Sequence, residues 1–266
     1  MADVGSPALP AFPEIIAPES WRAIDFISDL HLADNTPRTF EAFALHLRHT
    51  DADAVFILGD LFEVWVGDDA AQSGFEARCA AVLADTAQRR VVAFMAGNRD
   101  FLVGPELLRA CNVKALADPT VLVAFGARTL LSHGDALCLS DVSYQRFRAQ
   151  VRSEAWQHEF LARPLTERRQ IARELRDASQ RRKAQQAVGE WFDLERNETL
   201  RWMQAAATPT LIHGHTHLPA SEQLAPGFER HVLSDWDLDD SGPARAEVLR
   251  WRREGLVRMA PATAPR

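Results

Sequence analysis

Seven residues with metal-binding side chains lie in short clusters along the sequence. Two clusters hold a pair of donors separated by one residue, Asp29-x-His31 and His215-x-His217. The other three donors each stand next to a glycine: Asp60, Asn98 and His133. Residues i and i+2 of an extended backbone point to the same side, so each pair can face one cavity. Carboxylate, amide and imidazole ligands together suit Mn²⁺, Fe²⁺, Zn²⁺ or Ni²⁺ better than Ca²⁺.

Seven donors are more than one catalytic ion with open positions needs, and the carboxylate of Asp60 can bridge two cations. We therefore predict two divalent ions that share Asp60. Two ions about 3.5–4 Å apart can bind the attacking and the leaving oxygen of a phosphoryl displacement, and a hydroxide that bridges them can attack phosphorus. The donor pattern thus predicts a hydrolase of phosphate esters.

Each donor cluster follows a short apolar stretch that is typical of a β-strand. The five stretches are residues 23–28, 54–58, 91–96, 128–131 and 210–212. Between them, residues 39–49 and 75–89 have the apolar spacing of amphipathic helices. This alternation predicts an α/β fold, in which functional sites form at the carboxyl ends of the strands.

The middle of the chain has a different character. Residues 144–207 are rich in Arg, Ala, Gln, Glu and Leu, which predicts two or three helices without strands. Strand character returns at 231–233 and 246–251. We therefore predict a core of residues 21–142 and 208–260, a helical lid at 143–207 and an extended leader at 1–20.

Composition limits the class of protein. The chain has 266 residues, of which 47% are hydrophobic and 25% charged, as in ordinary globular proteins. We find no run of about 18 apolar residues and no signal peptide with a basic start. The three cysteines form no zinc or disulfide pattern, so we expect a cytoplasmic location. The net charge of −7 argues against a nucleic-acid partner.

The motifs Asp-x-His, Gly-Asp, Gly-Asn, His and Gly-His-x-His, in this order, resemble the calcineurin-like metallophosphoesterases. That resemblance implies a β-sandwich flanked by helices, with the helical lid as an insertion. It assigns one metal ion to Asp29, His31, Asp60 and His217. It assigns the other ion to Asp60, Asn98, His133 and His215.

Arg99 departs from the wider superfamily, in which a histidine thought to protonate the leaving group follows Gly-Asn. An arginine stays charged and cannot act as a general acid. It can instead hold phosphate oxygens through two parallel hydrogen bonds. Arg99 therefore favours a substrate whose leaving group departs without a proton, such as a phosphate monoester.

Longer segments resemble one family of lipid A synthesis, the UDP-2,3-diacylglucosamine pyrophosphatases; they are residues 27–32, 59–69, 97–102 and 133–138. The resemblance implies Mn²⁺-dependent hydrolysis of UDP-2,3-diacylglucosamine to UMP and 2,3-diacylglucosamine 1-phosphate, by an enzyme bound peripherally to the cytoplasmic face of the inner membrane. It implies four catalytic residues, Asp60, Asn98, Arg99 and His215. The substrate contacts that it implies are Asn98, Arg99, Asp141, Ser179, Lys183 and His215. It indicates no oligomeric state.

The predicted lid carries a basic run, residues 163–183, with eight basic and three acidic residues. Such a run predicts either a solvated helix face or a basic amphipathic surface for an anionic membrane or an acylated phosphosugar. The resemblance favours the second interpretation. Its apolar side would come from Trp156, Phe160, Leu161, Ile171 and Leu175.

Several alternatives stay open on the sequence. A phosphodiesterase of the same superfamily is disfavoured by Arg99 and the acidic chain, and a metal-free binding scaffold is disfavoured by the complete donor set. Asp141 could cap a helix instead of binding substrate. Four further acidic residues could stabilise turns or orient imidazole ligands: Asp68, Asp69, Asp100 and Asp135.

Overall fold

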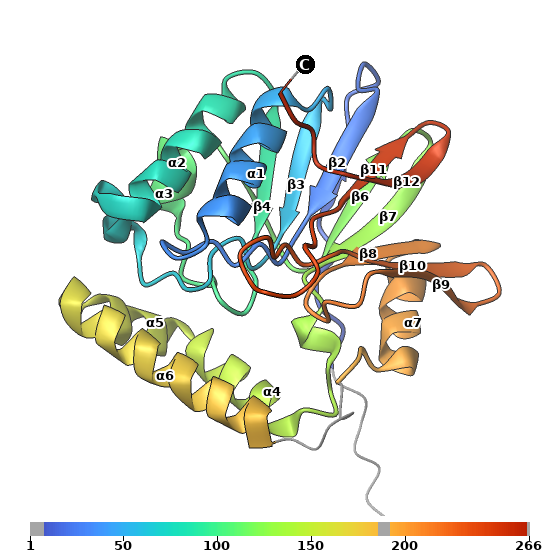
Figure 1. Ribbon diagram of the computed structural model, residues 1–266. Helices are drawn as coiled ribbons and strands as arrows, with labels where there is room; N and C mark the ends of the chain where they lie inside the picture. Colours follow the sequence, from blue (N-terminus) through green and yellow to red (C-terminus); the bar gives the residue numbers. More distant parts are fainter. Residues whose placement is uncertain (1–7, 186–191, 265–266) are drawn as a thin grey trace, which may run out of the picture.

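The structure, a computed structural model, describes residues 8–185 and 192–264, with the backbone alone for 177–185. Two six-stranded sheets stack face to face at its centre (Figure 1). The first sheet has the order β12 (Gly255–Met259), β11 (Val248–Arg252), β2 (Ala23–Ile27), β3 (Ala54–Leu58), β4 (Val91–Met95) and β5 (Lys114–Leu116). The second has the order β1 (Glu14–Ile16), β6 (Thr120–Ala124), β7 (Ala127–Ser132), β8 (Thr210–His213), β10 (Phe228–Val232) and β9 (Ala220–Ala225).

Strands β2 to β5 run parallel, as do β7, β8 and β10. Helices α1 (Pro37–His49), α2 (Gly74–Ala87) and α3 (Pro105–Ala110) cover the outer face of the first sheet. Helix α7 (Arg196–Ala205) packs on the second sheet. The result is an α/β sandwich flanked by helices, which confirms the predicted fold class.

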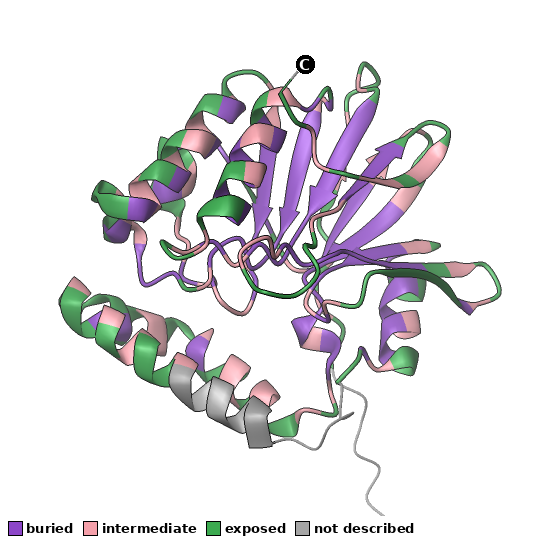
Figure 2. Cartoon of the chain, viewed as in Figure 1, coloured by how far each residue is buried: buried purple, intermediate pink, exposed green. Residues whose placement is uncertain are grey.

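The central strands are apolar in an unbroken run because both of their faces are buried. In β2, Phe26 packs between the sheets, while Ile27 packs toward the helices with Phe43 of α1. In β8, Ile212 joins the layer between the sheets. A strand buried on both faces has no polar side to alternate with, so these strands could be predicted from composition alone. Figure 2 shows this burial across both sheets.

The sequence did not predict the four edge strands, of which β5 has only three residues. The residues of β9 are mostly exposed, and those of β12 are mostly half-buried, so neither has a strong apolar pattern. Strand β1 lies within the predicted extended leader and pairs in parallel with β6. Residues 1–7 of that leader lie outside the described residues.

Three helices form a further layer on the side of the strand ends (Figure 1): α4 (Val142–Val151), α5 (Glu154–Leu161) and α6 (Leu165–Gln185). We call these three helices the lid. The segment predicted as a lid, 143–207, also contains α7, but Trp202 and Met203 of α7 are buried against the second sheet. On packing grounds, α7 belongs with the core.

Candidate active site

The seven predicted donors lie on the loops that follow five strands at one edge of the sandwich. Asp29 and His31 follow β2, Asp60 follows β3, and Asn98 follows β4. The other three follow two strands of the second sheet: His133 after β7, and His215 and His217 after β8. The carboxyl ends of these parallel strands meet at the same edge, so residues distant in sequence become neighbours.

These loops turn sharply, and their backbone is unusual. Five of the seven donors have positive φ angles between 50° and 70°, a conformation that L-residues rarely adopt: Asp29, His31, Asp60, His215 and His217. Each such residue costs about 1–3 kcal/mol unless its surroundings hold it. The surrounding fold must therefore offset this conformational cost while it holds these side chains toward the site.

Two glycines let the loops approach one another. A Cβ atom added to Gly97 would lie 2.2 Å from Oδ1 of Asp60, and one added to Gly214 would lie 2.3 Å from Oδ2 of Asp29. A larger residue at either position would displace a predicted ligand.

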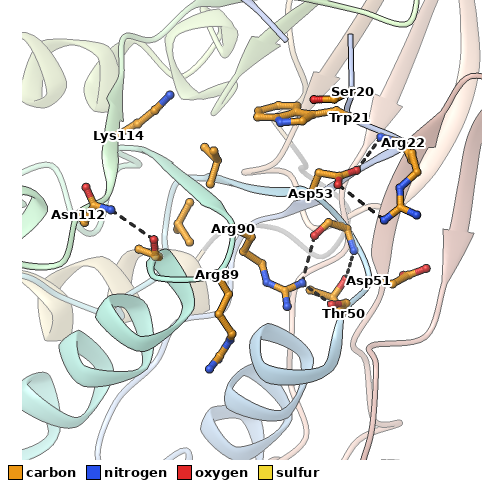
Figure 3. A pocket seen from close by; sticks show the side chains of 14 residues that line it. Ser20, Trp21, Arg22, Thr50, Asp51, Asp53, Arg89, Arg90, Asn112 and Lys114 are labelled. Atoms are coloured by element: carbon orange, nitrogen blue, oxygen red, sulfur yellow. Dashed lines mark hydrogen bonds and ion pairs between the residues drawn. The ribbon is translucent and has the colours of Figure 1, made fainter. Parts of the chain in front are cut away.

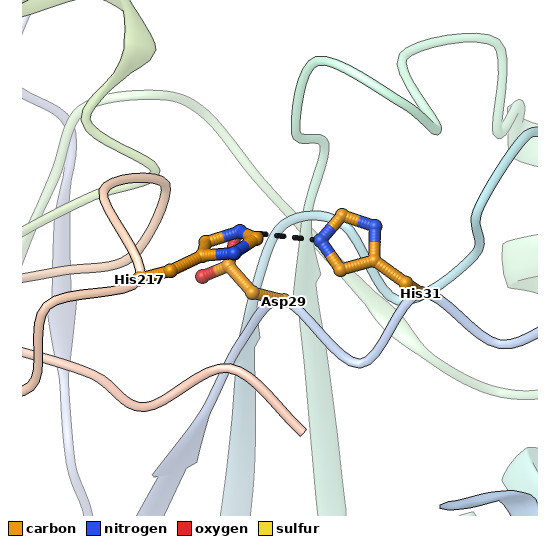
Figure 4. Close-up of side chains that lie close together, drawn as sticks. All are labelled: Asp29, His31 and His217. Carbon is orange, nitrogen blue, oxygen red and sulfur yellow. Dashed lines mark hydrogen bonds and ion pairs between the residues drawn. The ribbon is translucent and has the colours of Figure 1, made fainter. Parts of the chain in front are cut away.

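The first group of donors is Asp29, His31 and His217, shown in Figure 4. One ligand atom of each residue lies within 4.8 Å of the others. Nε2 of His31 lies 3.3 Å from Nε2 of His217, which in turn lies 3.3 Å from Oδ1 of Asp29. Oδ2 of Asp60 is 4.0 Å from Nε2 of His31, so Asp60 stands beside this group.

The second group lies deeper. Ligand atoms of Asp29, Asp60 and His133 also lie within 4.8 Å of one another. Oδ1 of Asn98 is 3.0 Å from Nε2 of His133 and 2.8 Å from Nδ1 of His215. The arrangement thus brings all seven predicted donors into two adjoining groups. Asp29, as well as Asp60, stands between the two groups.

The donor set fits divalent metal ions. Oδ1 of Asp29 is buried and has no hydrogen-bond partner, although an unpaired buried carboxylate oxygen is costly. The imidazole nitrogens of His31 and His217 converge on the same space. A cation placed among these lone pairs would satisfy all three, and this N/O set is one that Mn²⁺, Fe²⁺ and Zn²⁺ accept.

The electrostatics of the site reflect its crowded charges. Burial disfavours the ionised form of Asp29, but the surrounding histidines, His217 first, hold its pKa well below the usual range. Burial lowers the pKa of His133, but the charges of Asp60 and Asp29 outweigh burial and raise the pKa to about 9. Burial and the neighbouring His133 lower the pKa of His215 to about 4. The ionised carboxylates therefore create a strongly cation-attracting centre.

Asp100 is fully buried and holds two ligand loops together. Its carboxylate accepts hydrogen bonds from the backbone N–H groups of Gly97 (2.7 Å), Leu61 (2.7 Å) and Asp60 (3.3 Å). Burial and the charge of Asp60 raise the pKa of Asp100. Of the two roles that the sequence left open for this residue, the structure shows the stabilisation of turns.

The other three acidic residues also bind backbone or arginine groups. Asp68 accepts from the N–H groups of Gly104 and Leu107 at the start of α3, and Asp69 pairs with Arg168. Asp135 pairs with residues of α4 and of the turn after it; they are Tyr144, Arg148 and Arg152. The imidazole of His133 is instead oriented by the carbonyl of Leu58, 2.9 Å from its Nδ1.

Arg99 lies beside the donors, as predicted. Its backbone N–H donates to Oδ1 of Asp60 at 2.8 Å, and its guanidinium lies 3.7 Å from Glu63. Glu63 lies within the segment 59–69 that carries the family resemblance, but the sequence assigns it no role. Its carboxylate also lies 3.0 Å from Nδ1 of His31 and 2.9 Å from Arg176 of α6. Its position three residues after Asp60, at the end of the same strand, could have marked Glu63 as a residue of the site.

The remaining predicted substrate contacts lie on or before the lid. Oδ1 of Asp141 accepts from the backbone N–H of Tyr144 and from the hydroxyl of Ser143, each at 2.9 Å, so this residue does cap α4. Ser179 and Lys183 fall on α6, but their side chains lie outside the described residues.

Part of the predicted amphipathic surface packs against the core. Arg168 is 3% exposed and donates to Asp69 and to the carbonyl of Val66. Trp156 and Phe160 stack on each other and pack against the core. These three residues therefore help to fasten the lid to the sandwich, and membrane binding by the rest of the predicted surface stays a prediction. Leu161 and Leu175 are exposed.

A separate cavity of about 570 Å³ lies at the opposite, amino-terminal ends of β3, β4 and β5 (Figure 3). Two of its charged groups bind neighbouring backbone: Asp53 accepts from the backbone of Arg22, and Arg90 donates to carbonyl groups of residues 50 and 52. None of the predicted site residues lines it.

Comparison with known proteins identifies the family of this chain. Residues 23–219 match the calcineurin-like phosphoesterase family. The chain is 44% identical over 230 residues to a UDP-2,3-diacylglucosamine hydrolase of Chromobacterium violaceum, covering 83% of this chain and 96% of the relative. It is 43% identical over 250 residues to that of Ralstonia nicotianae (90% and 92%) and 38% identical over 244 residues to that of Stenotrophomonas maltophilia strain K279a (88% and 98%).

The chain therefore belongs to the calcineurin-like phosphoesterases and, within them, to the family of the UDP-2,3-diacylglucosamine hydrolases. This finding confirms the predicted family, and with it a metal-dependent hydrolase. In the described part of the chain, no helix combines the length and the apolar character needed to cross a bilayer.

Proposed function

We propose that this chain hydrolyses the pyrophosphate bond of UDP-2,3-diacylglucosamine, releasing UMP and 2,3-diacylglucosamine 1-phosphate. The observation that carries the proposal is the convergence of seven donors from five strand ends, beside an arginine that cannot donate a proton. The names of the relatives support the choice of substrate.

The proposed cofactors are two Mn²⁺ ions. Asp29, His31 and His217 would hold one ion, and His133, Asn98 and His215 the other, with Asp60 shared. When bound, such ions polarise phosphoryl oxygens and lower the pKa of water. The buried carboxylates of this site supply the negative charge that a pair of divalent cations requires.

Arg99 is the proposed clamp for the phosphate oxygens. Its backbone is tied to Asp60, so its guanidinium starts from a fixed point beside the donors. A bidentate guanidinium can stabilise negative charge that develops on the phosphoryl group. Hydroxide attack on either phosphorus of the pyrophosphate breaks the bond to the other phosphate, which departs as a phosphate monoester anion, so the reaction needs no general acid at this position.

The lid is the proposed binding element for the acylated sugar. Tyr144 of α4 stacks over His215, with ring centroids 6.0 Å apart, so the lid reaches the donor groups directly. Asp141, Ser179 and Lys183 remain proposed substrate contacts. The free oxygen lone pairs of the Asp141 carboxylate leave it able to cap α4 and to accept from a sugar hydroxyl.

The decisive experiment is hydrolysis of UDP-2,3-diacylglucosamine with Mn²⁺, beside bis-p-nitrophenyl phosphate and cyclic AMP, with Asn98→Ala as the blank. We expect EDTA-sensitive release of UMP from the lipid substrate. Turnover of the simple diesters without action on the lipid would retain the metal site and refute the lipid assignment.

Peripheral binding to the cytoplasmic face of the inner membrane is also proposed, through the exposed Leu161 and Leu175 and the exposed Arg173 of the lid. The test is co-sedimentation with liposomes that contain anionic lipid. Arg173→Glu should weaken salt-sensitive binding, whereas the same change at Arg109, on core helix α3, should not. Equal sedimentation of both variants would refute this surface.

A further inference from the structure

Glu63 occupies a junction between the site and the lid. It lies on the loop after β3, and its side chain is 14% exposed. Its two carboxylate oxygens face different parts of the molecule: Oε2 lies 3.0 Å from Nδ1 of His31, and Oε1 lies 2.9 Å from Nε of Arg176. One carboxylate thus joins a proposed metal ligand to α6.

On the side of the site, Glu63 can orient His31. The two ring nitrogens of His31 face opposite ways: Nε2 faces His217 and Asp60, and Nδ1 faces Glu63. A carboxylate at the second nitrogen of a ligating imidazole holds the ring in place and raises its basicity as a ligand. The φ angle of 50° at His31 makes such an external support more important, because its backbone conformation is intrinsically unfavourable.

On the side of the lid, Arg176 differs from the other arginines of α6 that pair with the core. Arg168 pairs with Asp69, and Arg169 pairs with Glu76 at 3.3 Å, both away from the donor groups. Arg176 pairs with a residue that itself touches a proposed ligand. Arg99 adds a further cation 3.7 Å from the same oxygen, Oε1.

We propose that Glu63 is a positioning residue that couples metal binding at His31 to the docking of α6 through Arg176. The inference rests on the metal site of the proposed function, but not on the identity of the substrate. Coupling between two sites is reciprocal. A metal ion that fixes His31 should therefore fix Glu63 and stabilise the docked lid, and loss of the Arg176 pair should weaken the metal site in return.

The first test is calorimetric titration of the full chain with Mn²⁺. Replacing a carboxylate that supports a ligating histidine weakens metal binding by about 10–100-fold, so Glu63→Gln should do the same. The matched control is Arg169→Gln, which removes another ion pair between α6 and the core and should bind Mn²⁺ as the unchanged chain does. Thermal unfolding of each variant shows whether it is folded.

The second test is amide hydrogen exchange of residues 165–176, with and without Mn²⁺. In the unchanged chain, Mn²⁺ should slow this exchange by several-fold. The slowing should vanish in Glu63→Gln and in Arg176→Gln, and persist in Arg169→Gln. Arg176→Gln changes a half-exposed residue on a helix surface, so it tests the coupling even if Glu63→Gln does not fold.

The outcomes separate the inference from the proposed function. If the unchanged chain binds no Mn²⁺, the proposed metal site and this inference both fail. If it binds Mn²⁺ but Glu63→Gln binds equally well, or Arg176→Gln retains the slowed exchange, only the coupling is overturned. If coupling is found but UDP-2,3-diacylglucosamine is not hydrolysed, the substrate assignment alone fails.

Discussion

The donor edge of the sandwich and the lid are built by different means. At the donor edge, carboxylates such as Asp29 and Asp100 are fully buried, and backbone N–H groups hold them. The lid is held to the core by packed apolar side chains such as Phe160 and by ion pairs of arginine side chains, of which only Arg168 is deeply buried among the described α6 arginines. The donor residues are therefore held largely by backbone geometry. The lid helices are held by side-chain contacts, which single substitutions can replace more easily.

The largest effect is expected when one donor residue of the site is removed. Asn98→Ala should lower the rate of phosphoester hydrolysis by about 10²–10³-fold, because a single preorganised polar group in an active site contributes this much. The loss should be equal for the lipid substrate and for bis-p-nitrophenyl phosphate, measured as kcat/KM. A loss confined to the lipid would place Asn98 in substrate recognition instead.

A second substitution tests the backbone itself. Gly97→Ala puts a methyl group 2.2 Å from Oδ1 of Asp60, so the Asp60 carboxylate or its loop must move. We expect Mn²⁺ affinity to fall by at least about 10-fold, since ligand orientation controls affinity on this scale. Calorimetric titration measures the change. Gly227→Ala is a useful control for an added methyl group, because its Cβ would meet open space, although its φ of 82° adds strain.

Acid should destabilise the core through His46 of α1. This side chain is fully buried, its Nδ1 accepts from the backbone N–H of Ala262, and burial lowers its pKa to about 4. The unfolded chain binds a proton near pH 6.5, so stability is highest above that pH and is lost as the pH falls toward 4. Urea unfolding should show a contribution of about 2 kcal/mol between pH 7 and pH 5.

The variant His46→Gln identifies the source of that acid sensitivity. An amide oxygen can replace the acceptor for Ala262 but does not titrate. Its unfolding free energy should therefore depend less on pH than that of the unchanged chain. An identical pH dependence would assign the effect to other buried groups, such as His213, whose pKa burial lowers to about 3.

The last substitution tests the lid side of the molecule. Asp69→Ala leaves the guanidinium of Arg168 buried without its carboxylate, which should cost about 1–3 kcal/mol. Because only the lid is loosened, KM for the lipid substrate should rise while hydrolysis of bis-p-nitrophenyl phosphate stays unchanged. Glu159→Ala, which removes an exposed partner of Arg163, should change neither. A fall in diester turnover with Asp69→Ala would show that lid and donor edge are not separable.

The same contrast explains what could be predicted from the sequence. Each donor follows an apolar strand, so their common edge could be inferred, as with Asp60 after 54–58. The partners of Glu63 could not, because Arg176 lies on a helix whose docking depends on tertiary contacts. Arg168 could not be predicted either: its basic neighbours predict a solvated face or a surface for anionic lipid, yet its side chain is buried and binds the Val66 carbonyl and Asp69. Edge strand β9 carries too few buried side chains to leave a pattern.

The lid enters the chain after β7, and the chain returns to the core at α7 and then at β8, which is hydrogen-bonded to β7 along its length. The sheet therefore sets where the intervening segment starts and stops but not how long it is, and closing a longer loop costs little additional entropy. A lineage could lengthen, shorten or replace these helices while His133 and His215 keep their places. Changes in this one inserted segment can therefore alter which substrates the chain binds. Grafting a lid from a relative between the same two strands is a practical route to altered specificity.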